Sequence, residues 1–368
     1  YKLDVGNELA VYGRVLGASD GRDAPTGPSL QSSKPTFRVA SDGTVTVRDD
    51  ILFTGRTTLT SLSNINDVFV YDTTKDTDGG EWTCNDIARA TSWYNEPLNT
   101  ATRGKTRCFP RKAILTATND NLFIYDAKDN SMWMRFNEGS TASTTMSIIG
   151  DTGSSHSSAQ ALNGKAYLGN STATDDSGLI AIDFKADTAY FSDDTSRVQY
   201  KAGINERNAT TLGYGAAVNS LALVNKVVND VSAAVVNGKT YVAVATGAGG
   251  SLINETDGVV YDYTNGATVF NKVWLTSQGD LYINMNSGSI GFDVTYKAIN
   301  KTADWTNSTR SYQYYEAIAP AIIGATANTI QDFYVTERTS TIDSSYNTIY
   351  LGNAAGVTVL NEKQGDET

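Results

Sequence analysis

The sequence is poor in the residues that most catalytic and metal sites require. Its 368 residues include one histidine and two cysteines. A Ser-His-Asp or Cys-His catalytic set, and most zinc sites, need more of these side chains. The single histidine, His156, lies in the polar stretch GSSHSS, which we interpret as a solvated loop. The sequence therefore predicts no catalytic set, no metal site and no cofactor.

Long apolar runs and strong positive charge are also missing. No stretch approaches the roughly 20 apolar residues that cross a bilayer, and no signal peptide is visible. The chain begins at Tyr1 rather than Met, so we expect a fragment or a processed chain. The net charge of −11, with only 19% charged residues, indicates a diffusely acidic surface that repels phosphates. We therefore expect no membrane insertion and no nucleic-acid partner.

Short runs of alternating apolar and polar residues recur along the chain, bounded by Gly, Asn and Asp. Examples are KAYLGN (165–170), SAAVVNGKTYVAVAT (232–246) and TIYLGNAAGVTVLNE (348–362). A period of two between turn residues is typical of antiparallel strands. The tripeptide NGK, at 163–165 and 237–239, predicts tight hairpin turns because Asn and Gly accept positive φ. The predicted fold class is all-β.

The strands belong to a repeating unit with an aromatic anchor. DVFVYD (67–72) and NLFIYD (121–126) are interpreted as the same third strand of two successive units. The anchors at positions 69, 123, 167, 241 and 282 are 54, 44, 74 and 41 residues apart, and we interpret the interval of 74 as two units. Four-stranded units of about 40–50 residues are typical of β-propeller blades, whose radial packing hides strand edges. We expect a β-propeller of roughly six to seven four-stranded blades.

Residues 1–58 differ from this repeat. The stretch 17–29 holds two of the six prolines and is typical of a linker, whereas 36–55 resembles a separate hairpin. We expect a short β-rich segment that serves as a stalk or an attachment; an irregular first blade is the alternative. The propeller domain is predicted to span 59–368.

Carboxylates are frequent, but no pair stands out by its spacing. The aspartic-protease tetrapeptide DTGS begins at Asp151 and DSG begins at Asp176, although such enzymes draw their two motifs from separate lobes. DTTKDTDGGE (72–81) resembles a calcium loop but lacks the EF-hand order, so an acidic turn is the better interpretation. A glycosidase pair has too many candidates, namely Asp49, Asp50, Asp175, Asp176 and Glu81. We therefore predict that the protein is not an enzyme.

Both cysteines lie in one long connection, residues 79–110. Cys84 and Cys108 bracket a stretch rich in aromatic and basic residues. A disulfide between them would close this stretch into a ring and remove about 3 kcal/mol of unfolded-state freedom. Two independent buried thiols are the alternative, and we favour the disulfide. Such a bond requires an oxidising setting, as outside the cell.

The residues in and beside this ring have two interpretations. In the first, they form a ligand platform on which aromatic rings stack against a sugar and polar groups bind its hydroxyls. The candidate contacts are Trp82, Trp93, Tyr94, Asn95 and Arg103. In the second, the same residues pack together as a cap on one face of the propeller. We favour the cap and keep the platform as a hypothesis.

Residues 79–137 hold a long and compositionally unusual run. It comprises Gly79, Gly80, Trp82, Thr91 to Glu96, Leu98 to Gly104, Phe109, Pro110, Tyr125, Asp126, Met132, Trp133 and Met134. This run resembles a segment in large structural proteins of tailed phages, especially phages of marine bacteria. The stretch 229–264 resembles the propeller part of the same proteins. The two cysteines depart from the family run, and residues 1–58 match nothing in it.

The resemblance implies a virion component, with other virion proteins as partners and an extracellular particle as its location. We predict a non-enzymatic tail-fibre or spike-type module for host attachment, with host-surface glycan as its ligand. A homo-oligomer is compatible with this role, although no coiled-coil heptads support a trimer. Two alternatives stay open. One is a polysaccharide hydrolase or lyase with carboxylates converging at the central channel, and the other is a bacterial surface adhesin or filament subunit.

Overall fold

The computed structural model describes most of the chain after residue 63 and four short strands before it. The described residues are 2–3, 6–7, 37–39, 45–47, 64–139, 147–150, 153–172, 178–209, 213–266, 268–287, 289–315, 330, 332–337, 347–353 and 356–362. The chain divides into two units, Tyr1–Ser61 and Leu62–Thr368. The first unit contains two antiparallel pairs of strands. These are β1 (Lys2–Leu3) with β2 (Gly6–Asn7), and β3 (Phe37–Val39) with β4 (Val45–Val47).

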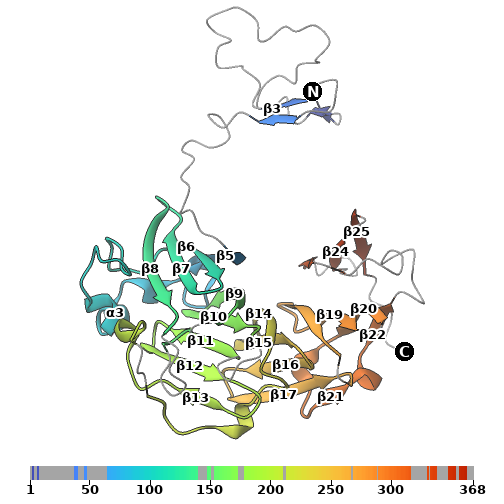
Figure 1. Cartoon of the computed structure of the whole chain (residues 1–368). Helices are drawn as coiled ribbons and strands as arrows, with labels where there is room; N and C mark the ends of the chain where they lie inside the picture. The colour runs from blue at the N-terminus through green and yellow to red at the C-terminus, as the bar shows by residue number, and fades with distance from the viewer. Residues whose placement is uncertain are drawn as a thin grey trace, which may run out of the picture. The chain divides into compact units, whose positions relative to one another are not determined.

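The second unit is a succession of five sheets, which we call blades 1 to 5 in chain order (Figure 1). Blade 1 consists of β5 (Ile65–Asp72), β6 (Lys112–Thr118), β7 (Asn121–Asp126) and β8 (Ser131–Asn137). Blade 2 consists of β9 (His156–Leu162), β10 (Lys165–Asn170), β11 (Leu179–Asp183), β12 (Thr188–Ser192) and β13 (Arg197–Gln199). Blade 3 consists of β14 (Val228–Val236), β15 (Lys239–Thr246), β16 (Gly249–Asn254) and β17 (Val259–Thr264), with β21 (Trp305–Thr306) added in parallel. Blade 4 consists of β18 (Phe270–Leu275), β19 (Leu281–Ser287), β20 (Ser289–Thr295) and β22 (Tyr312–Tyr315). Blade 5 consists of β23 (Asp332–Thr336), β24 (Thr348–Asn353) and β25 (Gly356–Asn361).

Among the described residues, helical segments are short and lie in the connections. The α-helices there are α2 (Asp86–Arg89) and α3 (Ser92–Asn95). The 3₁₀ turns are η4 (Thr73–Lys75), η5 (Glu81–Thr83), η6 (Ile204–Glu206), η7 (Asn219–Leu221), η8 (Ala298–Asn300) and η9 (Asn307–Thr309). No helix among the described residues has the length and apolar character needed to span a membrane.

The order of the strands makes the second unit a five-blade β-propeller arrangement. Within each blade the first strand lies at one edge of the sheet and the later strands follow outward in chain order. The first strands β5, β9, β14, β18 and β23 contact one another in succession. This is the geometry of a propeller, in which sheets meet at their innermost strands and radiate from an axis.

Strand periodicity explains how the blades stack. In β15, Tyr241, Ala243 and Ala245 pack with blade 4, whereas Val242 and Val244 point the other way and pack with blade 2. Successive side chains of a strand alternate between the two faces of its sheet, so one apolar strand contributes to two interfaces. Four separate apolar clusters lie between blades 1 and 2, 2 and 3, 3 and 4, and 4 and 5.

The predicted hairpin turns are present at both NGK sequences. Asn163 and Gly164 have φ of 55° and 80°, and Asn237 and Gly238 have φ of 51° and 76°. Two consecutive residues with positive φ are the signature of the type I′ turn, whose twist matches that of the strands it joins. These turns connect β9 to β10 and β14 to β15.

The predicted number of blades was too high. The described residues form five blades of four, five, five, four and three strands, counting β21 in blade 3. DVFVYD and NLFIYD are not equivalent strands of two units, because they form β5 and β7, the first and third strands of one blade. The 74-residue interval after Tyr167 holds the rest of blade 2, including its extra fifth strand β13, and the long connection to blade 3 rather than another unit.

Candidate functional site

The connection between β5 and β6 is closed into a ring by a disulfide. Cys84 and Cys108 are bonded, with their Cα atoms 4.8 Å apart, which confirms the predicted pairing. Inside the ring, two one-turn helices are capped by side chains. Asn85 accepts hydrogen bonds from the backbone N–H groups of Ile87 and Ala88, and Thr91 accepts one from Tyr94. Such caps satisfy backbone donors that a short helix leaves unpaired.

The two tryptophans proposed as ligand contacts are buried. The Trp82 indole N–H donates to the Asp76 carboxylate at 2.9 Å, and the Trp93 N–H donates to the Phe184 carbonyl in blade 2 at 2.8 Å. The ring centroids of Trp93 and Trp133 lie 5.5 Å apart in an edge-to-face arrangement. These side chains form part of the apolar cluster between blades 1 and 2, and they leave no ring face open to solvent.

Arg103, the third proposed contact, is also fully buried. Its Nε lies 2.8 Å from Oε1 of Glu96, and its guanidinium carbon lies 4.3 Å from the centre of the Trp133 ring. The other oxygen of Glu96 accepts a hydrogen bond from Arg207 at 2.8 Å. Burial lowers the pKa of Arg103 to about 10, and the Glu96 carboxylate acts in the opposite direction. One carboxylate therefore ties the ring to the segment that follows blade 2.

The remaining two proposed contacts lie closer to the surface. Tyr94 is half-buried, and its ring centre is 5.9 Å from the guanidinium carbon of Arg107. Asn95 is exposed, and its amide nitrogen donates to the carbonyls of Arg89 and Thr91, each at 2.9 Å. The five residues thus belong to a packed structure of which only Tyr94 and Asn95 reach solvent. A direct ligand contact by either of these two stays a prediction.

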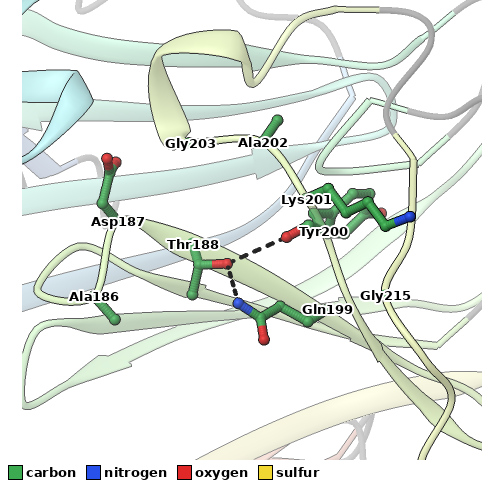
Figure 2. A pocket seen from close by; sticks show the side chains of 9 residues that line it. All are labelled: Ala186, Asp187, Thr188, Gln199, Tyr200, Lys201, Ala202, Gly203 and Gly215. Carbon is green, nitrogen blue, oxygen red and sulfur yellow. Dashed lines mark hydrogen bonds between the residues drawn. The ribbon is translucent and has the colours of Figure 1, made fainter.

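An open polar pocket of about 490 Å³ lies beside the ring, on the outer edge of blade 2 (Figure 2). It is lined by Ala186, Asp187, Thr188, Gln199, Tyr200, Lys201, Ala202, Gly203 and Gly215. The turn before β12 supplies one wall, and β13 with the chain after it supplies another. No motif in the sequence pointed to these residues, because hairpin ends rich in Ala, Thr and Gly are common in β-proteins.

Asp187 joins this pocket to the ring. Its carboxylate accepts hydrogen bonds from the Ser92 N–H and hydroxyl at 2.7 Å each, and from the Ile204 N–H at 3.1 Å. Asp187 has a φ of 54°, a left-handed conformation that Asp adopts more readily than most residues. Gly203 lies directly against Ser92. A Cβ at position 203 would be 2.6 Å from the Ser92 hydroxyl oxygen, so this close approach requires a glycine. The ring and the pocket therefore form one connected structure.

The chemistry of the pocket favours a hydroxylated ligand. The Gln199 amide donates to the Thr188 hydroxyl at 3.1 Å, and the Lys201 side chain is exposed at the pocket edge (Figure 2). Amide, hydroxyl and ammonium groups can donate to hydroxyl or carboxylate oxygens of a saccharide. Because Asp187 is already engaged by three donors, Gln199 and Lys201 are the groups most accessible to a ligand.

A second polar cluster lies along the first strands of the blades. Asp67 of blade 1 accepts from the Ala159 N–H of blade 2 at 2.8 Å. Asp230 of blade 3 accepts from the Ser158 hydroxyl of blade 2 at 2.9 Å and from the Val273 N–H of blade 4 at 3.0 Å. Burial raises the pKa of Asp230 to about 6. These contacts, which we call latches, join blade 1 to blade 2, blade 2 to blade 3 and blade 3 to blade 4.

The other residues considered for chemistry have structural positions or lie outside the described residues. His156 begins β9 and is fully buried, so the interpretation as a solvated loop residue was wrong. Glu81 is exposed at the start of η5. Asp49, Asp50, Asp151, Asp175 and Asp176 lie outside the described residues. Within the described part of the chain, no group of three or more His, Cys, Asp or Glu side chains could hold a metal ion.

No family model and no curated protein matches the chain. Among solved structures 414 chains match. The N-terminal domain of Nup159 is 11% identical over 70% of this chain and 60% of its own, with a TM-score of 0.35. The dihydro-heme d1 dehydrogenase NirN in complex with DHE is 8% identical over 69% and 56%, with a TM-score of 0.33.

A third structure, YCF48 bound to D1 peptide, is 9% identical over 70% of this chain and 76% of its own, with a TM-score of 0.33. For the first two structures, Nup159 and NirN, the match covers less than two thirds of the other chain. Likenesses this low carry no argument about function. The resemblance to phage structural proteins stays a prediction.

Proposed function

We propose that the chain is a non-enzymatic attachment module of an extracellular particle, a tail-fibre or spike-type component of a virion that binds host-surface glycan. The disulfide-closed ring fixed beside an open polar pocket is the observation that carries this proposal. A disulfide persists in oxidising surroundings such as the outside of a cell. The run at 79–137 that resembles phage structural proteins supports the virion context and other virion proteins as partners.

The geometry suits a rigid binding surface. The ring is held by its disulfide, by the Glu96 ion pairs and by Asp187, so the pocket wall keeps its shape without a ligand. A site that is ordered before binding loses less conformational entropy when the ligand arrives. Glycan binding would use the exposed groups of Gln199 and Lys201 on this preformed wall.

The test is direct binding of bacterial capsular and lipopolysaccharide fragments to the oxidised protein, measured by calorimetry. Gln199→Ala and Lys201→Ala should each weaken binding at least about tenfold, because a hydrogen bond to a charged or polar partner contributes about 1.5 kcal/mol. Lys239→Ala is the matched control, since Lys239 is an exposed lysine that pairs with Asp257 in blade 3. If a saccharide binds both pocket variants as tightly as the wild type, or if no fragment binds at all, the pocket is not the glycan site.

A polysaccharide hydrolase or lyase is the second candidate, and one observation favours it. Asp230 has a raised pKa of about 6, Asp67 contributes to that rise, and both lie on the first strands of blades. A carboxyl with a raised pKa can act as a general acid near neutral pH. The latch contacts give these carboxylates a structural role as well. New reducing ends from host polysaccharide, lost in Asp230→Asn with the fold intact, would establish the enzyme.

A bacterial surface adhesin or filament subunit is the third candidate. It would use the same rigid propeller and pocket, and its partners would be cell-surface molecules instead of virion proteins. The genes next to its own would discriminate the two, because a virion component is encoded among phage tail genes.

A further inference from the structure

The last blade of the array exposes a position that earlier blades bury. Tyr167, Tyr241, Tyr282 and Tyr350 lie near the start of the second strand of blades 2, 3, 4 and 5. The first three are 0%, 8% and 0% exposed, because each packs into the cluster shared with the following blade. Tyr350 is 39% exposed. The repeat therefore places on blade 5 a side chain whose counterparts are covered.

Tyr350 is the centre of an apolar stripe across blade 5. It is directly paired with Tyr334 on β23 and with Val359 on β25, and Val357 lies two residues before Val359 on the same face. These three neighbours are exposed as well. Directly paired side chains on one face of a sheet form a continuous surface. We call this surface the Tyr350 face.

Blade 1 exposes the side of its first strand that, in the other blades, packs against the preceding blade. Val68 and Val70 on β5 are 53% and 59% exposed. Their counterparts on the other first strands are buried against the preceding blade, namely Ala159 and Ala161 on β9, Val231 on β14, Val273 and Leu275 on β18, and Phe333 and Val335 on β23. Blade 1 thus presents the side that normally receives a preceding blade. We call it the Val68 face.

The first strands of blades 5 and 1 also carry the two polar groups of a latch. In the latches between blades, a side chain on one first strand accepts the N–H of the next strand, as Asp230 accepts that of Val273. Asp332 holds the equivalent position on β23, where its carboxylate accepts the N–H of Phe333 in its own strand and lies 4.0 Å from the Lys272 ammonium of blade 4. The N–H of Val68, which corresponds to that of Val273, donates to Asp67 in its own strand. The acceptor and the donor of one more latch are therefore both present, and each now has a hydrogen-bond partner in its own strand.

We propose that the Tyr350 face and the Val68 face are the two halves of one blade interface, and that in solution the first blade of the same chain covers the fifth. The Asp332 carboxylate then accepts the Val68 N–H. Contact within one chain is favoured because both halves are linked, which gives an effective concentration in the millimolar range. In a head-to-tail contact, the Tyr350 face of one copy would meet the Val68 face of another. One face would stay uncovered at each end of such a pair, so further copies would add to it.

The experiment is a disulfide trap at the proposed latch. The Val273 N–H donates to the Asp230 carboxylate at 3.0 Å, so these two residues lie side by side on neighbouring first strands. Asp230→Cys with Val273→Cys is therefore the control for an existing latch, and Asp332→Cys with Val68→Cys tests the proposed one. Cys84 and Cys108 are already paired and do not compete. After mild oxidation we expect a monomer with the new cross-linked peptide in both double variants.

Two results would overturn the proposal. One is a bond between Val68→Cys and Asp332→Cys that forms only between molecules and increases with protein concentration, which would make a second copy the occupant. The other is free thiols in this variant while the control pair is oxidised. Hydroxyl-radical footprinting of the unmodified protein gives an independent measure. Tyr350 should react as slowly as Tyr282, and a rate at least fivefold faster would contradict the closed ring.

Discussion

At the scale of single residues, Asp76 shows how buried polar groups define the region around the ring. Its carboxylate accepts hydrogen bonds from the Tyr71 hydroxyl at 2.5 Å, the Trp82 N–H at 2.9 Å and the Asn163 N–H at 2.8 Å. Three donors from two blades converge on one acidic side chain. A carboxylate engaged in this way has little capacity left for a cation, which agrees with an acidic turn in place of a calcium loop.

His156 is a second residue whose burial has a measurable consequence. Neither ring nitrogen has a hydrogen-bond partner among the residues that the structure describes, and burial lowers the pKa of His156 to about 3 from its ordinary value of 6.5. The unfolded chain binds a proton below pH 6.5, but the folded chain does not until about pH 3. The stability contributed by the neutral imidazole is therefore complete above pH 6.5 and is lost as the pH falls through this window.

We expect the free energy of unfolding to fall by about 1.4 kcal/mol per pH unit from this group below pH 6. Urea unfolding at pH 7, 5 and 4 measures the dependence. His156→Phe removes the titrating group while keeping a ring, so the difference between the two proteins isolates the histidine from the carboxylates. Parallel pH profiles for the two proteins would show that His156 is not held neutral.

At the scale of elements, the ring acts as a brace between blades 1 and 2. Its aromatic residues fill the cluster between these blades, and Gly104 lies so close to β8 that a Cβ there would be 1.9 Å from the Met132 carbonyl oxygen. The short helices α2 and α3 cannot be stable alone, because isolated helices of this length do not form in water. Their conformation depends on the disulfide and on packing against blade 2.

Removal of the disulfide should loosen this brace. In the Cys84→Ser and Cys108→Ser double variant, we expect the free energy of unfolding to drop by about 3 kcal/mol, since a ring of this size restricts the unfolded chain by that amount. Trypsin should then cleave after Lys105 or Arg107 faster than in the oxidised protein. Wild-type protein in reductant should behave like the variant. Equal cleavage rates in all samples would mean that packing alone holds the ring.

At the scale of the whole molecule, stability comes from a series of similar interfaces between blades. Each interface combines apolar residues from two sheets, and the first three interfaces also have a polar latch on the first strands. In such an array the cost of a substitution depends on whether the neighbouring blade is in place. The equivalent tyrosines of successive blades provide matched positions to compare.

Tyr282→Ala should lower the free energy of unfolding by about 3–5 kcal/mol, because it empties a buried site in the cluster between blades 4 and 5. Tyr350→Ala should cost more than about 2 kcal/mol if the first blade covers it, whereas a surface site would cost less than about 0.5 kcal/mol. Denaturant titrations of the two variants and the wild type give both values. A negligible effect of Tyr350→Ala would speak against the closed ring independently of the disulfide trap.

The errors of the sequence-based prediction have a common physical cause. Alternation of apolar residues identifies a strand, but it does not say which sheet the strand joins. DVFVYD and NLFIYD have similar sequences and suggested the same strand of two blades, but they are the first and third strands of one blade. The polar neighbours of His156 likewise suggested a loop, whereas its burial depends on strands that pack around it from elsewhere in the chain.

The sequence by itself determined the local features of this protein: the strands, the NGK turns and the cysteine pair that closes the ring. These depend on period-two patterning, on residues that tolerate positive φ and on two thiols separated by 24 residues. Only the tertiary structure decided which strands share a blade, that Trp93 and Arg103 are buried, and where the pocket lies. Those properties come from contacts such as Trp93 with Phe184 and Glu96 with Arg207, between residues about 90 to 110 positions apart, which no local pattern encodes.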